Sequence, residues 1–160
     1  MNTTFPVFVD GIVVHGLNRG RRTLGFPTAN VDKETVSNLC TNLTDGVYFG
    51  YARVDYGPTY RSLISVGNNP QFKGVTRSFE VHILHEFEED FYSSRLRTVV
   101  VGKLRSMMAY ESIQGLIKAI ASDIADANRI MDKIEEKELE KYTMCLDQLN
   151  NLPENGISQP

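Results

Sequence analysis

Apolar and polar side chains alternate through the stretch Ser78-Phe79-Glu80-Val81-His82-Ile83-Leu84. Successive side chains of a β-strand point to opposite faces, so the apolar members Phe79, Val81 and Ile83 share one face. Glu80 and His82 then share the other face. The stretch therefore predicts a β-strand with one face turned to a core.

Similar short runs, rich in Val, Ile, Phe, Tyr and Thr, occur on both sides of this stretch. The six candidate strands are Phe5–Val14, Pro27–Val31, Gly46–Val54, Tyr60–Val66, Arg77–Leu84 and Arg97–Leu104. Turn residues such as Asp45-Gly46 and Gly67-Asn68-Asn69-Pro70 separate the runs at regular spacing, which favours antiparallel pairing. Open sheet edges promote aggregation, so we expect a mainly β fold that closes into a small six-stranded barrel.

From about residue 110 onward, the pattern changes to the period of an α-helix. Apolar residues recur three and four positions apart from Ile113 to Ile134, which predicts a helical face packed on the barrel. Asp132 with Glu135 predicts an N-cap that splits the stretch into two helices near Met131, and a single kinked helix is the alternative. We expect one domain over 1–160, with the barrel at about 5–105, the helices at about 110–149 and a tail at 150–160.

The composition of the chain restricts its partners. The 160 residues, 41% of them apolar and 23% charged, can form one hydrophobic core. A formal net charge of -3 argues against a protein that follows a nucleic-acid backbone. The sequence has neither a secretory signal nor an apolar run of about 18 residues, and Cys40 and Cys145 form no C-x-x-C motif. We expect a cytoplasmic monomer with no membrane or nucleic-acid partner.

A loop of unusual composition, His15–Gly25, joins the first two candidate strands. It holds three glycines, which allow backbone N–H groups to approach a ligand, and three arginines, whose guanidinium groups match phosphate oxygens. The loop predicts a polyphosphate site, and a solvated basic turn is the alternative. Gly20 and Gly25 have the spacing of a Walker A motif, but Phe26-Pro27 follows where Lys and Ser or Thr are required.

Two further features, the pair Thr28 and Asn30 and the residue Glu80, have both a chemical and a structural interpretation, and spacing and composition alone favour the structural one. Thr28 and Asn30 lie two apart on a candidate strand, so their oxygens share a face and suit Mg²⁺; hydrogen bonds to neighbouring strands are the alternative. Glutamate is depleted in strands, so Glu80 lies on a solvated face or accepts a proton from a substrate hydroxyl.

Three features near the last candidate strand have simpler interpretations. The acidic run 86–90, followed by Phe91-Tyr92, predicts a solvated turn with an aromatic anchor. Arg105 either contacts a ligand or pairs with one of these carboxylates. Met107 and Met108 are expected to pack beneath the helices.

The sequence as a whole resembles the riboflavin kinase (flavokinase) family. The motifs that carry the resemblance are Gly16 with Arg19-Gly20, Leu24-Gly25-Phe26-Pro27-Thr28-Ala29-Asn30, Asp45-Gly46-Val47-Tyr48-Phe49-Gly50, Ser65-Val66-Gly67-Asn68-Asn69-Pro70, Phe79-Glu80-Val81-His82, Glu89-Asp90-Phe91-Tyr92 and Leu104-Arg105. They occur in family order, and the Pro-Thr-Ala-Asn element is the most specific of them.

The resemblance implies a six-stranded antiparallel Greek-key β-barrel with C-terminal α-helices packed on it. It also implies transfer of the γ-phosphoryl group of ATP to the ribityl 5′-hydroxyl of riboflavin, which gives FMN and ADP. By motif, Thr28 and Asn30 would hold Mg²⁺ or another divalent cation, and Glu80 would be the catalytic base. The chain has no room for the adenylyltransferase domain to which bacterial members are commonly fused, so a stand-alone enzyme is implied.

The remaining site residues also follow from the resemblance. Gly16 and Arg22 would line the phosphate loop, His85 and Tyr92 would lie near the nucleotide, and Arg105 would belong to a flap over the flavin. Animal members usually have Lys where Arg22 stands, and Pro and Lys within the stretch occupied here by 106–108.

Two other functions are weighed against the kinase. A barrel that binds flavin or a nucleotide without chemistry would need neither metal ligands nor a base, so the joint presence of Thr28, Asn30 and Glu80 favours catalysis. A barrel that binds single-stranded nucleic acid needs aromatic platforms in a positive groove, and the chain is acidic and has no Trp.

Overall fold

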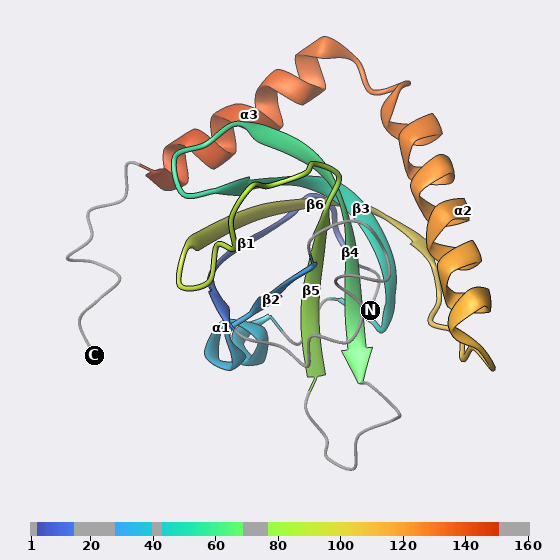
Figure 1. The fold of residues 1–160 in the computed structure, drawn as a ribbon. Helices are drawn as coiled ribbons and strands as arrows, with labels where there is room; N and C mark the ends of the chain where they lie inside the picture. Colours follow the sequence, from blue (N-terminus) through green and yellow to red (C-terminus); the bar gives the residue numbers. More distant parts are fainter. Residues whose placement is uncertain (1–2, 15–27, 40–42, 69–76, 151–160) are drawn as a thin grey trace.

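Six antiparallel strands close into a barrel (Figure 1). The computed structural model describes residues 3–14, 28–39, 43–68 and 77–150. The strands are β1 (Val7–Val14), β2 (Thr28–Val31), β3 (Gly46–Val54), β4 (Thr59–Asn68), β5 (Arg77–Ile83) and β6 (Arg95–Arg105). Their order around the barrel is β1-β2-β5-β4-β3-β6. Strand β6 returns to lie beside β3, the first strand of the β3-β4-β5 meander, which makes a Greek key and confirms the expected fold.

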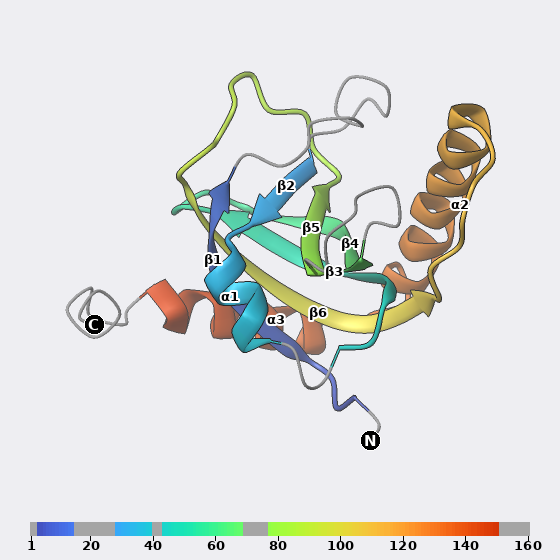
Figure 2. The ribbon, with the colours of Figure 1, turned by 90° about the horizontal axis from the view of Figure 1, so that it is seen from below.

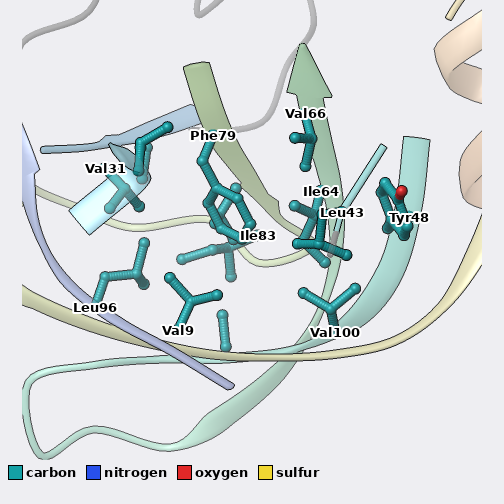
Figure 3. Packing of buried hydrophobic residues seen from close by; sticks show 14 of the residues in the cluster. Val9, Val31, Leu43, Tyr48, Ile64, Val66, Phe79, Ile83, Leu96 and Val100 are labelled. Carbon is teal, nitrogen blue, oxygen red and sulfur yellow. The ribbon is translucent and has the colours of Figure 1, made fainter. Parts of the chain in front are cut away.

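The side chains on one face of each strand fill the barrel interior. The predicted inward face of β5 is confirmed, because Phe79, Val81 and Ile83 belong to the inner hydrophobic cluster and are almost fully buried. Side chains such as Val9 of β1 and Val100 of β6 meet them from other strands (Figure 3). Polar residues that alternate with the inner set along β2 and β5 are therefore directed to the outside of the barrel.

Two helices cover part of the outer surface. They are α2 (Ile113–Met131) and α3 (Glu136–Asn150). Ala127 and Met131 of α2 pack with Leu146 of α3 against the outward side chains of β3, β4 and β6, so β3 is buried on both faces. Figures 1 and 2 show the two helices on the outside of the barrel. Among the described residues, no helix is long and apolar enough to cross a membrane.

The boundary between α2 and α3 differs in one detail from the prediction. The helical stretch does break after Met131, as expected. The proposed N-cap at Asp132 is wrong, since Asp132 is the C-cap of α2 and donates its backbone N–H to the carbonyl of Asn128 at 2.8 Å. Three more residues, 133–135, follow before α3 begins at Glu136.

A short helix that the sequence analysis did not predict, α1 (Lys33–Asn38), follows β2 directly. Asp32 is its N-cap, and its carboxylate accepts the backbone N–H of Thr35 at 3.1 Å and that of Ile12 in β1 at 2.9 Å. Val36, the one buried residue of the helix, joins the inner cluster. A single buried residue makes no apolar stripe, so helical periodicity could not have detected α1.

Candidate functional site

The pairing of β2 with β5 brings three predicted site residues together. Thr28 lies opposite His82, and Asn30 lies opposite Glu80, in an antiparallel register. Figure 2 shows β2 beside β5. The side chains of directly opposed residues on one face are neighbours, so Thr28, Asn30 and Glu80 form one cluster although β2 and β5 are far apart in the sequence.

Glu80 is a partly buried carboxylate rather than a solvated one. Burial raises the pKa of Glu80, and a hydrogen bond from the Asn30 side chain lowers it again in part. The amide of Asn30 thus donates to the carboxylate and fixes its orientation. A desolvated, oriented carboxylate is suited to accept a proton, which contradicts the solvated-face interpretation.

Thr28 has a buried hydroxyl with no hydrogen-bond partner among the described residues. Its Oγ1 atom makes no hydrogen bond to any described residue, so the interpretation that Thr28 only bonds a neighbouring strand is not supported. A buried polar atom left unsatisfied costs about 1–3 kcal/mol, which a ligand at this oxygen would recover. Opposite Thr28, burial lowers the pKa of His82 to about 4, so this imidazole is neutral at pH 7 and does not repel a cation.

A cavity of about 490 Å³ lies beyond the end of β5. Its lining includes Tyr60 at the start of β4 and His85, whose rings stack with centroids 3.9 Å apart, and Phe87 meets both rings edge-on. Glu86 and Glu88 complete this wall. His85 therefore lines a cavity, and its position near a nucleotide stays a prediction.

Tyr60 and Phe87 were missed by the sequence analysis. An antiparallel β4–β5 hairpin brings the end of β5 back to the start of β4, so the strand pattern held a signal that Tyr60 would adjoin His85. The acidic run does form the expected solvated turn with an aromatic anchor, since Phe87 packs on Phe91 with ring centroids 4.8 Å apart. Tyr92 packs against the inner cluster of the barrel.

Arg105, the last residue of β6, pairs with a carboxylate that was not considered from the sequence. Its Nε and Nη2 atoms donate to the two oxygens of Asp123 on α2, each at 2.8 Å, and the hydrogen bond raises the pKa of Arg105. The suggested pairing with the acidic run 86–90 is thus replaced by a pairing with α2.

Met107 and Met108, expected beneath the helices, are instead 43% and 64% exposed. The Sδ atom of Met107 lies 3.9 Å from Oγ of Ser65 in β4. The expectation failed because the segment between β6 and α2 runs along the surface beside β4 before the helix begins. Gly16 and Arg22, with the rest of the loop His15–Gly25, lie outside the described residues.

The fold and the site together define a class of protein: a closed Greek-key barrel that carries, on its outer face, an oriented and desolvated carboxylate near a buried hydroxyl that no described residue hydrogen-bonds. The family model for flavokinase (riboflavin kinase) matches residues 3–131. The chain belongs to the riboflavin kinase family.

Individual relatives agree with this assignment. Riboflavin kinase from Mus musculus is 40% identical over 136 residues, which span 85% of this chain and 88% of that protein. The crystal structure of riboflavin kinase from Trypanosoma brucei superposes with a TM-score of 0.67 at 29% identity, covering 89% of this chain and 90% of that one. A structure titled macrolide-efflux protein from Streptococcus pneumoniae matches with a TM-score of 0.62 at 32% identity; the match covers 77% of this chain and 38% of that longer chain.

Proposed function

We propose that the chain is an ATP:riboflavin 5′-phosphotransferase. It transfers the γ-phosphoryl group of ATP to the ribityl 5′-hydroxyl of riboflavin and releases FMN and ADP. The observation that carries this proposal is the cluster on β2 and β5, in which Asn30 orients Glu80 beside the unsatisfied hydroxyl of Thr28. Family membership supports the same reaction.

Thr28 and Asn30 fit a divalent cation. A hydroxyl and an amide carbonyl are hard oxygen ligands, which suit Mg²⁺ but not zinc. The Thr28 oxygen is buried, and no residue in the described ranges hydrogen-bonds it. Asn30 uses its amide N–H toward Glu80, which leaves its carbonyl oxygen for the ion. A divalent cation held by Thr28 and Asn30 would neutralise negative charge on the phosphates of ATP.

Glu80 acts as the base. Its carboxylate accepts the proton of the 5′-hydroxyl while that oxygen forms a bond to the γ-phosphorus and the bond from the γ-phosphorus to the ADP oxygen breaks. The transition state of such transfers is loose, so the proton moves late and the main task of Glu80 is to orient the hydroxyl. Asn30 supports this task because its hydrogen bond holds the carboxylate in one orientation.

The base of the nucleotide occupies the cavity at His85. Tyr60, His85 and Phe87 supply aromatic surface for a purine ring. Glu86 and Glu88 on the same wall repel phosphate oxygens, so the phosphates extend in the opposite direction, toward Thr28. Gly16 and Arg22 of the basic loop then contribute backbone N–H groups and positive charge to the phosphates.

The riboflavin side of the site involves Arg105, at the end of β6. We assign it to the part of the chain that closes on the flavin. The competing function, a barrel that binds flavin or nucleotide without chemistry, leaves the raised pKa of Glu80 and its fixed orientation unexplained.

The test is product formation. Pure protein incubated with Mg-ATP and riboflavin is expected to give FMN and ADP in equal amounts, separated and quantified by chromatography with flavin fluorescence. Folded protein that binds riboflavin stoichiometrically but forms neither product would identify a carrier and end the kinase proposal.

A further inference from the structure

Asp123 is the only buried carboxylate in the part of the chain that the structure describes. It is 5% exposed and lies four residues before Ala127 and eight before Met131, on the apolar stripe by which α2 packs on the barrel. A carboxylate at such a position is costly unless it is paired and hydrogen-bonded. Its presence there therefore requires an explanation beyond the docking of the helix.

The partner of Asp123 is held in a fixed plane. Arg105 donates Nε–H and Nη2–H to Asp123 at 2.8 Å each, which is a bidentate pair, and donates Nη1–H to the carbonyl of Ser106 at 3.1 Å. The guanidinium also lies over the ring of Tyr110, 5.8 Å from its centroid. These contacts determine where the remaining N–H groups of Arg105 point before any ligand arrives.

The register of the barrel places Arg105 in line with Glu80. Glu80 lies opposite Ser65, Ser65 lies opposite Val47, and Val47 lies opposite Arg105. Three strand spacings separate the two ends of this row, or about 14 Å along the sheet. Met107, two residues after Arg105, returns to Ser65 in the middle of the row. Glu80 and Arg105 therefore lie on the same outer face of the barrel, at a separation that an elongated acceptor can span.

We propose that Asp123 is a positioning residue for the acceptor substrate, which holds the guanidinium of Arg105 in the orientation that binds the end of riboflavin remote from the 5′-hydroxyl. This inference rests on the proposed kinase function and adds a residue of α2 to the acceptor site. Asp123 itself does not touch the substrate.

The other ion pairs between the helices and the barrel differ from this one. Arg61 of β4 pairs with Asp132 at 2.8 Å, and Asp132 is 66% exposed. Arg53 of β3 pairs with Asp147 of α3, which is 55% exposed. In both pairs the carboxylate is mostly exposed, although the Arg53 side chain is only 8% exposed, so neither pair places a buried carboxylate between a helix and the barrel. The buried, bidentate pair at the acceptor end of the site is the exception.

The experiment compares Asp123→Asn with Asp132→Asn, a matched change in the same helix at a pair remote from the row. For D123N, the KM for riboflavin is expected to rise about tenfold, as one charge-assisted hydrogen-bonded contact is weakened, while the KM for ATP and kcat change less than about twofold. Titration of riboflavin fluorescence with Mg-ADP present, which needs no turnover, should show the same loss of affinity. D132N should match the wild type in all of these measurements.

A double variant separates positioning from stability. Because Asp123 acts through Arg105, R105A/D123N should bind riboflavin as weakly as R105A alone, and Asp123→Glu should recover part of the affinity. An unchanged riboflavin KM in D123N, an equal rise in both KM values, or a D123N protein without a thermal unfolding transition would each overturn the inference, since the pair would then serve the fold alone. If the wild type makes no FMN, the kinase proposal itself fails, which is a different result from a normal wild type with a normal D123N.

Discussion

At the scale of single residues, the site depends on which polar atoms make hydrogen bonds within the protein and which do not. Asn30 donates its N–H to Glu80, and in the proposed site its carbonyl oxygen would bind the cation. Thr28 has no protein partner for its hydroxyl among the described residues. The cluster is thus organised before ligands bind, which is the arrangement that electrostatic catalysis favours.

Glu80→Gln tests the base. The substitution keeps the shape of the side chain but removes the proton acceptor, so kcat should fall on the order of 10²-fold or more. Binding of Mg-ADP, measured by calorimetry, should change little. Near-wild-type turnover in E80Q would show that Glu80 has no catalytic role.

The same residue predicts a pH dependence. Turnover requires the ionised carboxylate, so the rate is present above the pKa of Glu80 and is lost as the pH falls through it. Burial raises this pKa, so the acid limb of the kcat profile should lie above 4.5, the ordinary value for Glu. A limb at or below 4.5 would contradict the desolvation seen at this position.

Thr28→Val tests the cation ligand, with Thr98→Val as the matched control. Both hydroxyls are buried and make no hydrogen bond to described residues, but Thr98 lies on β6, away from the β2–β5 cluster. The Mg²⁺ concentration for half-maximal activity should rise about tenfold or more in T28V, equivalent to ~1.4 kcal/mol of lost binding. T98V should titrate like the wild type; equal titrations for the two variants would remove Thr28 from the metal site.

Sequence reasoning identified these side chains but could not place them. The alternation of side chains along a strand placed Thr28 and Asn30 on one face of the first strand, and Glu80 and His82 on one face of the second strand. Their union depends on the register between β2 and β5, which nothing local encodes. Asp123 was overlooked for the same reason, because a helical pattern does not reveal which strand residue will meet it.

At the scale of elements, α1 secures β2, the strand that carries Thr28 and Asn30. Its N-cap, Asp32, follows β2 directly and also accepts the backbone N–H of Ile12 in β1. The helix is too short to be stable alone, so its cap and Val36 must hold it. The end of β2 is thereby attached to β1 and to the barrel interior.

Asp32→Ala removes this attachment. Loss of an N-cap costs about 1 kcal/mol, which lowers Tm by about 2–4 °C in a protein of this size. Asp32→Asn retains an acceptor and should lose less. A D32A protein that melts with the wild type would show that these hydrogen bonds contribute no net stability.

The sign of the pH effect follows from the pKa of Asp32. Burial opposes ionisation, but the hydrogen bonds from Ile12 and Thr35 outweigh it and lower the pKa below 3.8. The stabilisation is complete above the unfolded value and is lost as the pH falls through the folded one. The difference in Tm between the wild type and D32A should therefore shrink in strong acid.

Most of the strands and helices could be predicted because the periodicity of their apolar residues is clear. All six strands were expected, and their ends differ from the predicted ones by no more than two residues. The exceptions are α1, which has no periodic apolar face, and the start of α3, where Asp132 has cap chemistry but serves the end of α2 instead. Local cap preference cannot decide between the two ends of adjoining helices.

At the scale of the whole molecule, nucleotide binding should be visible as stability. A ligand that binds only the folded state at 100 times its Kd adds about 2.7 kcal/mol, or about 5–10 °C in Tm here. Mg-ADP should produce such a shift, and addition of EDTA should abolish most of it if the cation joins Thr28 and Asn30 to the phosphates. Equal Tm shifts with and without EDTA would show that the nucleotide binds without a metal ion.

The double burial of β3 also limits how this architecture can be reused. Its inward residues complete the barrel, and its outward residues Val47, Phe49 and Tyr51 are covered by α2 and α3. A chain shortened after β6 would expose these apolar side chains to solvent. We expect such a truncated barrel to self-associate, so it could not be used as an isolated domain. Grafting or fusion work must therefore carry the terminal helices along with the strands.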